Sequence, residues 1–169
     1  LKNFDKDKDF YYWYRLKKEA QIIKKTTNQK KALDYIADKF ENIKDPNNKF
    51  IFDIANFYKN SKEYNQAIKY YSLIINSLDD NDIIKADVLY RRGGSYERLK
   101  DFLNADRDLK QSLKIDPEDA YVLNYLAYSW LERDYKIDEA IKMLEVAYER
   151  ENDDPYIIDS IGWAYYLID

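Results

Sequence analysis

The sequence contains no cysteine and no histidine. Without cysteine the chain has neither a disulfide framework nor a thiolate nucleophile. Without histidine it lacks the commonest general base, and the loss of both residue types excludes Cys/His zinc sites and Ser-His-Asp triads. No glycine-rich phosphate-binding loop is present either. The sequence therefore argues against an enzyme, and we expect neither a metal nor any other cofactor.

Glycine and proline are also scarce, at three each in 169 residues. This leaves little turn chemistry for an all-β fold. No apolar run reaches the roughly 20 residues that a membrane-spanning helix needs, so no membrane span is expected in this segment. Apolar residues make up 46% of the chain and charged residues 36%, which is enough apolar surface for a folded, largely helical domain.

Small residues recur through the chain at a nearly constant spacing. One series, with spacings of 35, 38, 34 and 35 residues, consists of Ala20, Ala55, Gly93, Ala127 and Gly162. A second series, with spacings of 35, 38 and 35, consists of Ala32, Ala67, Ala105 and Ala140. Small side chains let two antiparallel helices approach closely, and large apolar residues around them recur at the helical spacing of a buried stripe. Two series in fixed phase predict a stack of helical hairpins.

All three prolines directly follow an aspartate, at Pro46, Pro117 and Pro155. Aspartate is a favourable N-cap, and proline fits the first helical position because its missing N–H would have no partner there. Each pair therefore predicts a helix that begins at the proline. The segments 60–64 and 100–102 are predicted to be tight turns between the two helices of a hairpin.

Within each unit the order of large apolar, small, tyrosine and small residues resembles the tetratricopeptide repeat. The resemblance implies an all-α fold, a right-handed α-α superhelix of about nine helices. We expect one solenoid over residues 1–169, with repeats at 9–46, 48–79, 86–117 and 118–152 and a half repeat at 155–169. Arg92 departs from the pattern, which has a leucine there. Because the chain begins at Leu1 rather than methionine, we expect it to be a fragment of a longer protein.

A narrower resemblance covers residues 84–169. The segments 122–133, 138–140 and 159–165 are similar to long, often lipid-anchored tetratricopeptide proteins of the bacterial envelope. Some of those proteins serve as adaptors for periplasmic carboxyl-terminal proteases. The resemblance implies a location in the bacterial cell envelope or periplasm, with the cytoplasm as the alternative.

In tetratricopeptide solenoids the first helix of each hairpin lines the concave face, so the resemblance implies a peptide groove there. Tyrosine and tryptophan offer large, stiff contact surfaces, and asparagine can hydrogen-bond a peptide backbone. The candidate peptide-binding residues are Tyr90, Asn124, Tyr128, Tyr121, Trp163, Asp159, Arg98 and Asn56. The alternative is an ordinary helix surface in a chain that contains 18 tyrosines.

Charge is distributed unevenly along the chain. Residues 1–31 hold ten basic and four acidic residues, whereas residues 116–169 hold four basic and fourteen acidic residues. Nucleic acid is not an expected partner at a pI of about 5.1. A clamp for a C-terminal carboxylate is not expected either, because Asp53 and Asp87 occupy matching positions and would repel it.

We therefore expect a non-catalytic scaffold for protein–protein interaction that binds a peptide or protein partner on its concave face. The alternative is a structural module that assembles into homo-oligomers through its C-terminal helix. That helix has no partner helix in the sequence, so Trp163, Tyr165 and Tyr166 would be exposed.

Overall fold

The computed structural model describes residues 6–43 and 46–168, with side chains from residue 11 onward. Over these residues the chain forms nine α-helices and no strand, as predicted. The helices are α1 (Lys6–Thr26), α2 (Gln29–Glu41), α3 (Asn48–Asn60), α4 (Tyr64–Ile75), α5 (Ile83–Arg98), α6 (Phe102–Ile115), α7 (Ala120–Leu131), α8 (Ile137–Arg150) and α9 (Pro155–Ile168). None of them is both long enough and apolar enough to cross a bilayer.

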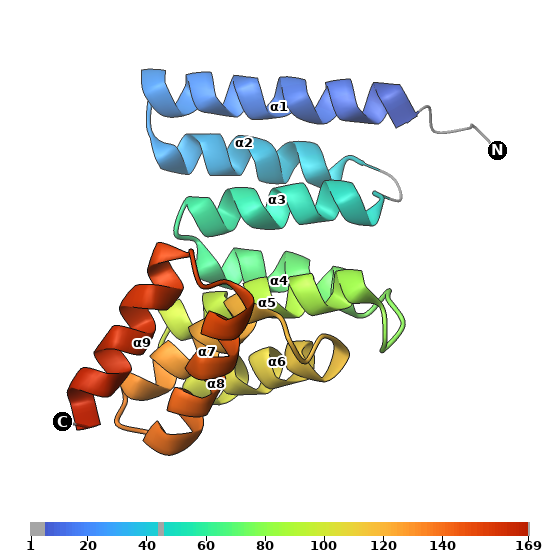
Figure 1. The fold of residues 1–169 in the computed structure, drawn as a ribbon. Helices are drawn as coiled ribbons and strands as arrows, with labels where there is room; N and C mark the ends of the chain where they lie inside the picture. Colours follow the sequence, from blue (N-terminus) through green and yellow to red (C-terminus); the bar gives the residue numbers. More distant parts are fainter. Residues whose placement is uncertain (1–5, 44–45, 169) are drawn as a thin grey trace.

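The helices stack one after another as antiparallel hairpins (Figure 1). The first four lie almost in register, and the last three, α7 to α9, are turned relative to them. In this view helix α1 lies at the top of the stack, and α9 ends near its bottom. This arrangement is the stack of helical hairpins that the repeat spacing predicts, and the all-α superhelix that the family resemblance implies.

The recurring small residues lie where the helices of a hairpin pack together. Every alanine of both series is at most 1% exposed, and Gly93 is buried as well. A Cβ added to Gly93 would lie 3.0 Å from Leu109 Cγ and 3.3 Å from the carbonyl oxygen of Ala105. A larger residue here would therefore require Leu109 and the α6 backbone to shift by a few tenths of an ångström.

Gly162 is the exception among the small residues. It is exposed, and a Cβ added there would meet no atom within 4 Å. On the same helix Trp163, Tyr165 and Tyr166 are 37%, 46% and 72% exposed. The described chain therefore leaves one side of α9 uncovered, as expected for a helix without a hairpin partner.

Polar side chains cap the N-termini of most helices. The caps of α2, α3, α5, α6, α7 and α9 are Asn28, Asn47, Asp82, Asp101, Asp119 and Asp154. Each accepts a hydrogen bond from a backbone N–H of the first turn, which would otherwise lack a partner.

Only one of the three Asp-Pro pairs starts a helix as predicted. Asp154 caps α9, and Pro155 is its first residue. The prediction for Pro117 is wrong, because Asp119 is the cap and α7 begins at Ala120. It is also wrong for Pro46, since Asn47 caps α3; Asp45 lies outside the described residues. In both cases an Asn or Asp a few residues further along the chain caps the helix instead, next to its apolar stripe.

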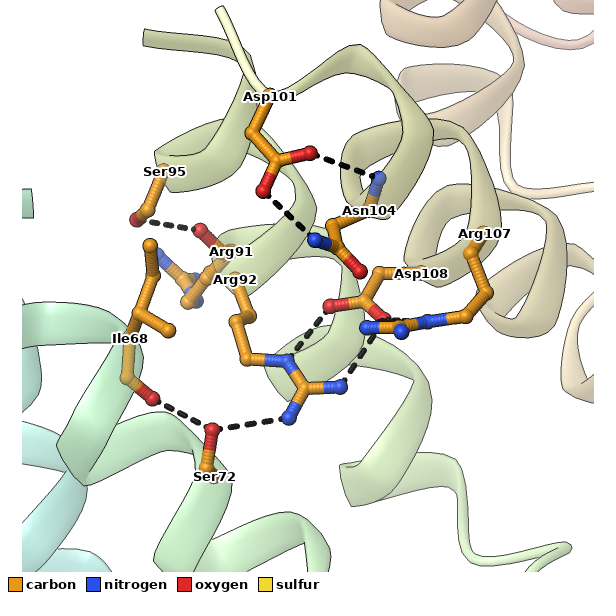
Figure 2. A network of polar contacts seen from close by, with 9 residues as sticks. All are labelled: Ile68, Ser72, Arg91, Arg92, Ser95, Asp101, Asn104, Arg107 and Asp108. Atoms are coloured by element: carbon orange, nitrogen blue, oxygen red, sulfur yellow. Dashed lines mark hydrogen bonds and ion pairs between the residues drawn. The ribbon is translucent and has the colours of Figure 1, made fainter. Parts of the chain in front are cut away.

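Arg92, the residue that departs from the repeat pattern, forms a buried ion pair between α5 and α6. Its Nε donates to Asp108 Oδ2 at 2.6 Å and its Nη2 to Oδ1 at 2.9 Å, while Nη1 donates to Ser72 Oγ on α4 at 2.9 Å (Figure 2). Asp108 is fully buried and also accepts from Arg107 at 3.0 Å. The network joins three consecutive helices, α4, α5 and α6.

Candidate functional site

The helices α3, α5, α7 and α9 meet along one side of the stack, which we call the first-helix face. The Arg91 guanidinium on α5 lies over the Phe52 ring of α3, 5.1 Å from its centroid. Tyr90 on α5 packs edge to face on Tyr125 of α7, with 5.7 Å between ring centroids. Helices α7 and α9 are in direct contact. These contacts make a continuous surface from α3 to α9.

A hollow of about 450 Å³ lies on this face between α3, α5 and α7. We call it the basic pocket, because four of the side chains that line it are cationic and none is anionic. Its lining residues are Lys59, Lys62, Tyr64, Tyr90, Arg91, Gly94, Arg98 and Tyr125.

The charges around the basic pocket are only partly balanced. Arg91 pairs with Asp87 at 3.0 Å, and Arg98 lies 3.7 Å from Glu97. Lys59 and Lys62 form no ion pair with any residue that the structure describes. Burial lowers the pKa of Lys59, and the neighbouring Arg91 lowers it further. The pocket therefore holds an excess of positive charge beside a half-buried lysine.

Tyr125 forms the wall of the basic pocket toward α7. Its hydroxyl donates to Glu97 Oε2 at 3.1 Å, and burial, reinforced by Glu97, raises its pKa. A Cβ on Gly94 would lie 3.4 Å from the Tyr125 hydroxyl oxygen, so the glycine leaves room for the ring. Tyr125 was not among the predicted site residues. The sequence feature that points to this pocket is Gly94, a small residue one helical turn before the predicted residue Arg98, because a small residue there leaves room for a ring from the next hairpin.

A second hollow, of about 800 Å³, lies between α7 and α9. We call it the acidic pocket; its lining residues are Tyr128, Glu132, Ile158, Asp159, Gly162, Trp163 and Tyr166. Burial raises the pKa of Tyr128, and the nearby carboxylates of Glu132 and Asp159 raise it further. Trp163 and Tyr166 stack with 5.5 Å between their ring centroids. Exposed aromatic rings and negative charge thus meet in one place.

Five of the eight predicted site residues line these two pockets. Tyr90 and Arg98 belong to the basic pocket, and Tyr128, Asp159 and Trp163 to the acidic pocket. The two pockets are adjacent, because Tyr125 and Tyr128 are one helical turn apart on α7. Residues Lys62 and Tyr64 were missed because they belong to the turn after α3 and to α4, whereas the sequence mapping considered first helices.

The other three predicted residues line neither pocket. Tyr121 is exposed on α7. Asn56 points to its own hairpin partner, since its Oδ1 accepts a hydrogen bond from Tyr71 at 2.7 Å. Asn124 is half-buried, and its Oδ1 is enclosed without a hydrogen bond from the described residues. Of these three residues, only Asn124 has a buried polar atom without a hydrogen-bond partner among the described residues.

The family comparison identifies the repeats directly. The family model described as tetratricopeptide repeat matches residues 49–76 and 86–119. A TPR repeat-containing protein of Pseudomonas aeruginosa is 32% identical over 80 residues, which are 47% of this chain and 14% of that protein. The chain thus spans about one seventh of the length of this relative.

Solved structures share the fold at low sequence identity. The MamA protein superposes with a TM-score of 0.67 at 15% identity, covering 92% of this chain and 80% of that one. The first TPR of Spaghetti (RPAP3), bound to an HSP90 peptide, gives a TM-score of 0.64 at 18% identity, covering 72% and 92%. The second TPR domain of human RPAP3, in complex with an HSP70 peptide, gives 0.60 at 16% identity, covering 70% and 98%.

The stacked hairpins, the buried small residues and the continuous first-helix face define a helical repeat solenoid. The family match assigns residues 49–76 and 86–119 to tetratricopeptide repeats, and the solved structures share the fold of the stack over most of the chain.

Proposed function

We propose that this chain is a non-catalytic scaffold that binds an extended peptide or protein segment along its concave, first-helix face. Tetratricopeptide domains are protein-interaction modules, and two of the related structures above are peptide complexes. The observation that carries the proposal is the pair of adjacent pockets between α3 and α9, in which exposed aromatic and charged side chains gather.

Exposed aromatic side chains favour this face as the binding surface. Tyr128 and Trp163 are 40% and 37% exposed at the acidic pocket, and such rings supply much of the binding energy in protein interfaces. A further hollow of about 520 Å³ lies between α2 and α4. Its tyrosines, Tyr58 and Tyr70, are buried core residues that stack on each other. That hollow therefore offers a ligand little aromatic surface.

The enclosed Oδ1 of Asn124 gives independent support. A buried acceptor without a partner costs roughly 1–3 kcal/mol, and native proteins keep few of them. Asn124 lies on α7 between Tyr121 and Tyr128, so a small adjustment on binding would let a peptide N–H pair with it. The site thus includes an acceptor that a bound backbone can satisfy.

A selection from random peptides tests the proposal. Dodecapeptides displayed on phage are selected on the immobilised protein, and the enriched peptides are synthesised and titrated by fluorescence anisotropy. We expect Tyr128→Ala to weaken binding by about tenfold, because one interface aromatic contributes roughly 1–2 kcal/mol.

Tyr148→Ala is the matched control. Tyr148 lies on the second helix α8 and is 41% exposed, against 40% for Tyr128. Its loss should leave affinity unchanged. If no peptide is enriched, or if both alanine variants bind like the wild-type protein, the proposal is wrong.

Self-association through α9 is the second candidate. It is favoured by the apolar side chains that α9 exposes, among them Tyr156 at 78%, Tyr166 at 72% and Ile168 at 56%. Large exposed apolar patches mark interaction surfaces. In light scattering, the mass should rise with concentration for the wild-type protein and stay monomeric for Tyr166→Ser/Ile168→Ser. A wild-type protein that is monomeric at every concentration rejects this candidate.

A further inference from the structure

The basic pocket has a chemical preference that the proposed function does not specify. Four cations line it, and two of them, Lys59 and Lys62, have no anionic partner among the described residues. The two carboxylates nearby, Asp87 and Glu97, are already paired with Arg91 and Arg98. An anion that enters the pocket would therefore meet two lysines that form no ion pair with a described residue.

Partial burial makes the positive charge of Lys59 more effective. Lys59 is half-buried, and both desolvation and Arg91 lower its pKa, which shows that the free pocket disfavours its own positive charge. A bound anion would reverse this penalty, because an opposite charge nearby favours the protonated lysine. In a site partly screened from water such a contact is stronger than on an open surface.

The surroundings limit what kind of anion fits. One helical turn away on α7 begins the acidic pocket, with Glu132 and Asp159. Neither carboxylate forms an ion pair within the described part of the chain. A polyanion such as nucleic acid or an acidic lipid surface would be repelled there. The ligand must instead carry a localised negative group next to a neutral or basic stretch, which is the pattern of an acidic residue in a peptide.

We propose that the basic pocket binds an acidic side chain of the peptide segment that the first-helix face holds. This inference rests on the proposed function and adds the kind of side chain that the bound peptide must carry. The tyrosines of the pocket suit the same ligand: Tyr64 lies beside Lys59 and Lys62, and Tyr90 packs against Tyr125. They offer apolar walls for the methylene groups and hydroxyl donors for the carboxylate.

Charge reversal at exposed positions tests the proposal without disturbing the core. Lys62 and Arg98 are both exposed, so the variant Lys62→Glu/Arg98→Glu should fold. The control Lys31→Glu/Lys142→Glu makes the same change of net charge at exposed positions on α2 and α8. Circular dichroism and thermal unfolding check both variants. The phage selection is then run in parallel on the three proteins, with peptides whose C-terminus is fused to the coat protein.

We expect the wild-type protein and the control to enrich aspartate or glutamate at one position of the selected peptides. The variant should lose this preference, and it should bind the wild-type peptides at least about tenfold more weakly, as is usual when a close charge pair is reversed. The acidic peptide with its aspartate or glutamate changed to the amide should show a similar loss on the wild-type protein and a smaller one on the variant. Since the displayed peptides have no free C-terminus, a terminal carboxylate cannot explain the result.

The other outcomes separate the two proposals. Peptides that depend on Tyr128 but show no acidic preference, or that bind the reversed variant unchanged, overturn the inference and leave the scaffold function standing. A labelled single-stranded thymidine oligonucleotide that binds the wild-type protein and not the variant, with no acidic peptide selected, also overturns it. A selection that enriches no peptide at all overturns both.

Discussion

Gly93 and Gly162 hold the same place in the repeat but have different surroundings. A Cβ on Gly93 would press on Leu109, which is fully buried among other core side chains. Overpacking of this kind costs about 1–3 kcal/mol, more than the helix propensity gained by replacing glycine. We expect Gly93→Ala to lower the free energy of unfolding by about 1–2 kcal/mol in urea titrations.

Gly162→Ala serves as the internal control for this prediction. With no atom within 4 Å of the added methyl group, only the backbone entropy and propensity terms remain. These favour alanine in a helix by about 0.5–1 kcal/mol. If both substitutions stabilise the protein equally, the close approach of α5 and α6 is not what requires the small residue at position 93.

The buried ion pair between Arg92 and Asp108 leads to a second prediction at the residue scale, on the stability of the chain. Asp108 is fully buried with two arginines on its oxygens. Removing one partner of a buried pair leaves an uncompensated charge and costs about 3–5 kcal/mol. Asp108→Ala should therefore destabilise the chain by about that amount in denaturant titrations.

The double variant Arg92→Leu/Asp108→Leu, unlike Asp108→Ala, should lose little stability. Leucine is the residue that the repeat pattern has at position 92, and apolar replacement of a whole buried pair is often neutral or stabilising. We expect its free energy of unfolding to lie within about 1 kcal/mol of the wild-type value. A double variant as unstable as Asp108→Ala would mean that the hydrogen bond to Ser72 contributes more than the charge balance.

At the scale of the helix, the hairpin turns depend on residues in a strained conformation. Lys62 after α3 and Lys100 after α5 both have left-handed backbones, with φ of 63° and 61°. In each turn the following N–H reaches back to close the helix, Glu63 to Tyr58 at 2.9 Å and Asp101 to Tyr96 at 3.0 Å. Glycine is the usual residue in this motif because it has no Cβ to strain.

Lys62→Gly and Lys100→Gly should therefore each raise the free energy of unfolding by about 0.5–1 kcal/mol, after the greater entropy of glycine in the unfolded chain is subtracted. The two variants differ in one respect, because only Lys62 lines the basic pocket. Thermal unfolding should respond alike to both, whereas affinity for an acidic peptide should fall only with Lys62→Gly. Equal affinities would place the lysine side chain outside the ligand's reach.

The helices also show which structural features the sequence predicts and which it does not. The small-residue series located the hairpins because close packing imposes a constraint that recurs in every repeat. The helix starts were harder, since Asp116 and Asp119 are both good caps and the choice depends on which one lets the apolar stripe of α7 meet α8. Nothing in the local sequence decides between two competing caps three residues apart.

The pockets were predicted less completely than the helices. Tyr128, Asp159 and Trp163 were found because they face outward on first helices. Lys62, Tyr64 and Tyr125 were not, because a pocket depends on which side chains from neighbouring helices share a hollow. Asn56 shows the converse: it lies on a first helix, but Tyr71 from the second helix occupies its oxygen. Those pairings depend on helix crossing, which a spacing pattern does not contain.

At the scale of the whole molecule, the tyrosine-rich core makes stability depend on alkaline pH. Burial raises the pKa of Tyr58, Tyr71 and Tyr125 above the ordinary value of 10.0, and burial together with Glu19 raises the pKa of Tyr35 to about 12. The folded chain therefore holds protons that the unfolded chain releases above pH 10. The stabilisation is complete below that pH and is lost as the pH rises. The lowered pKa of Lys59 acts in the opposite sense, but it is a single group, whereas several tyrosines have a raised pKa.

We expect helical circular dichroism to disappear cooperatively between about pH 10 and pH 12, together with a rise in phenolate absorbance. Tyr58→Phe should move this transition to higher pH, because it removes a core group whose ionisation favours the unfolded chain. Tyr156→Phe, at a position that is 78% exposed, should leave the transition in place. A protein that keeps its helices while its core tyrosines ionise would show that their hydroxyl groups reach solvent, and the buried packing of α3 with α4 would then need revision.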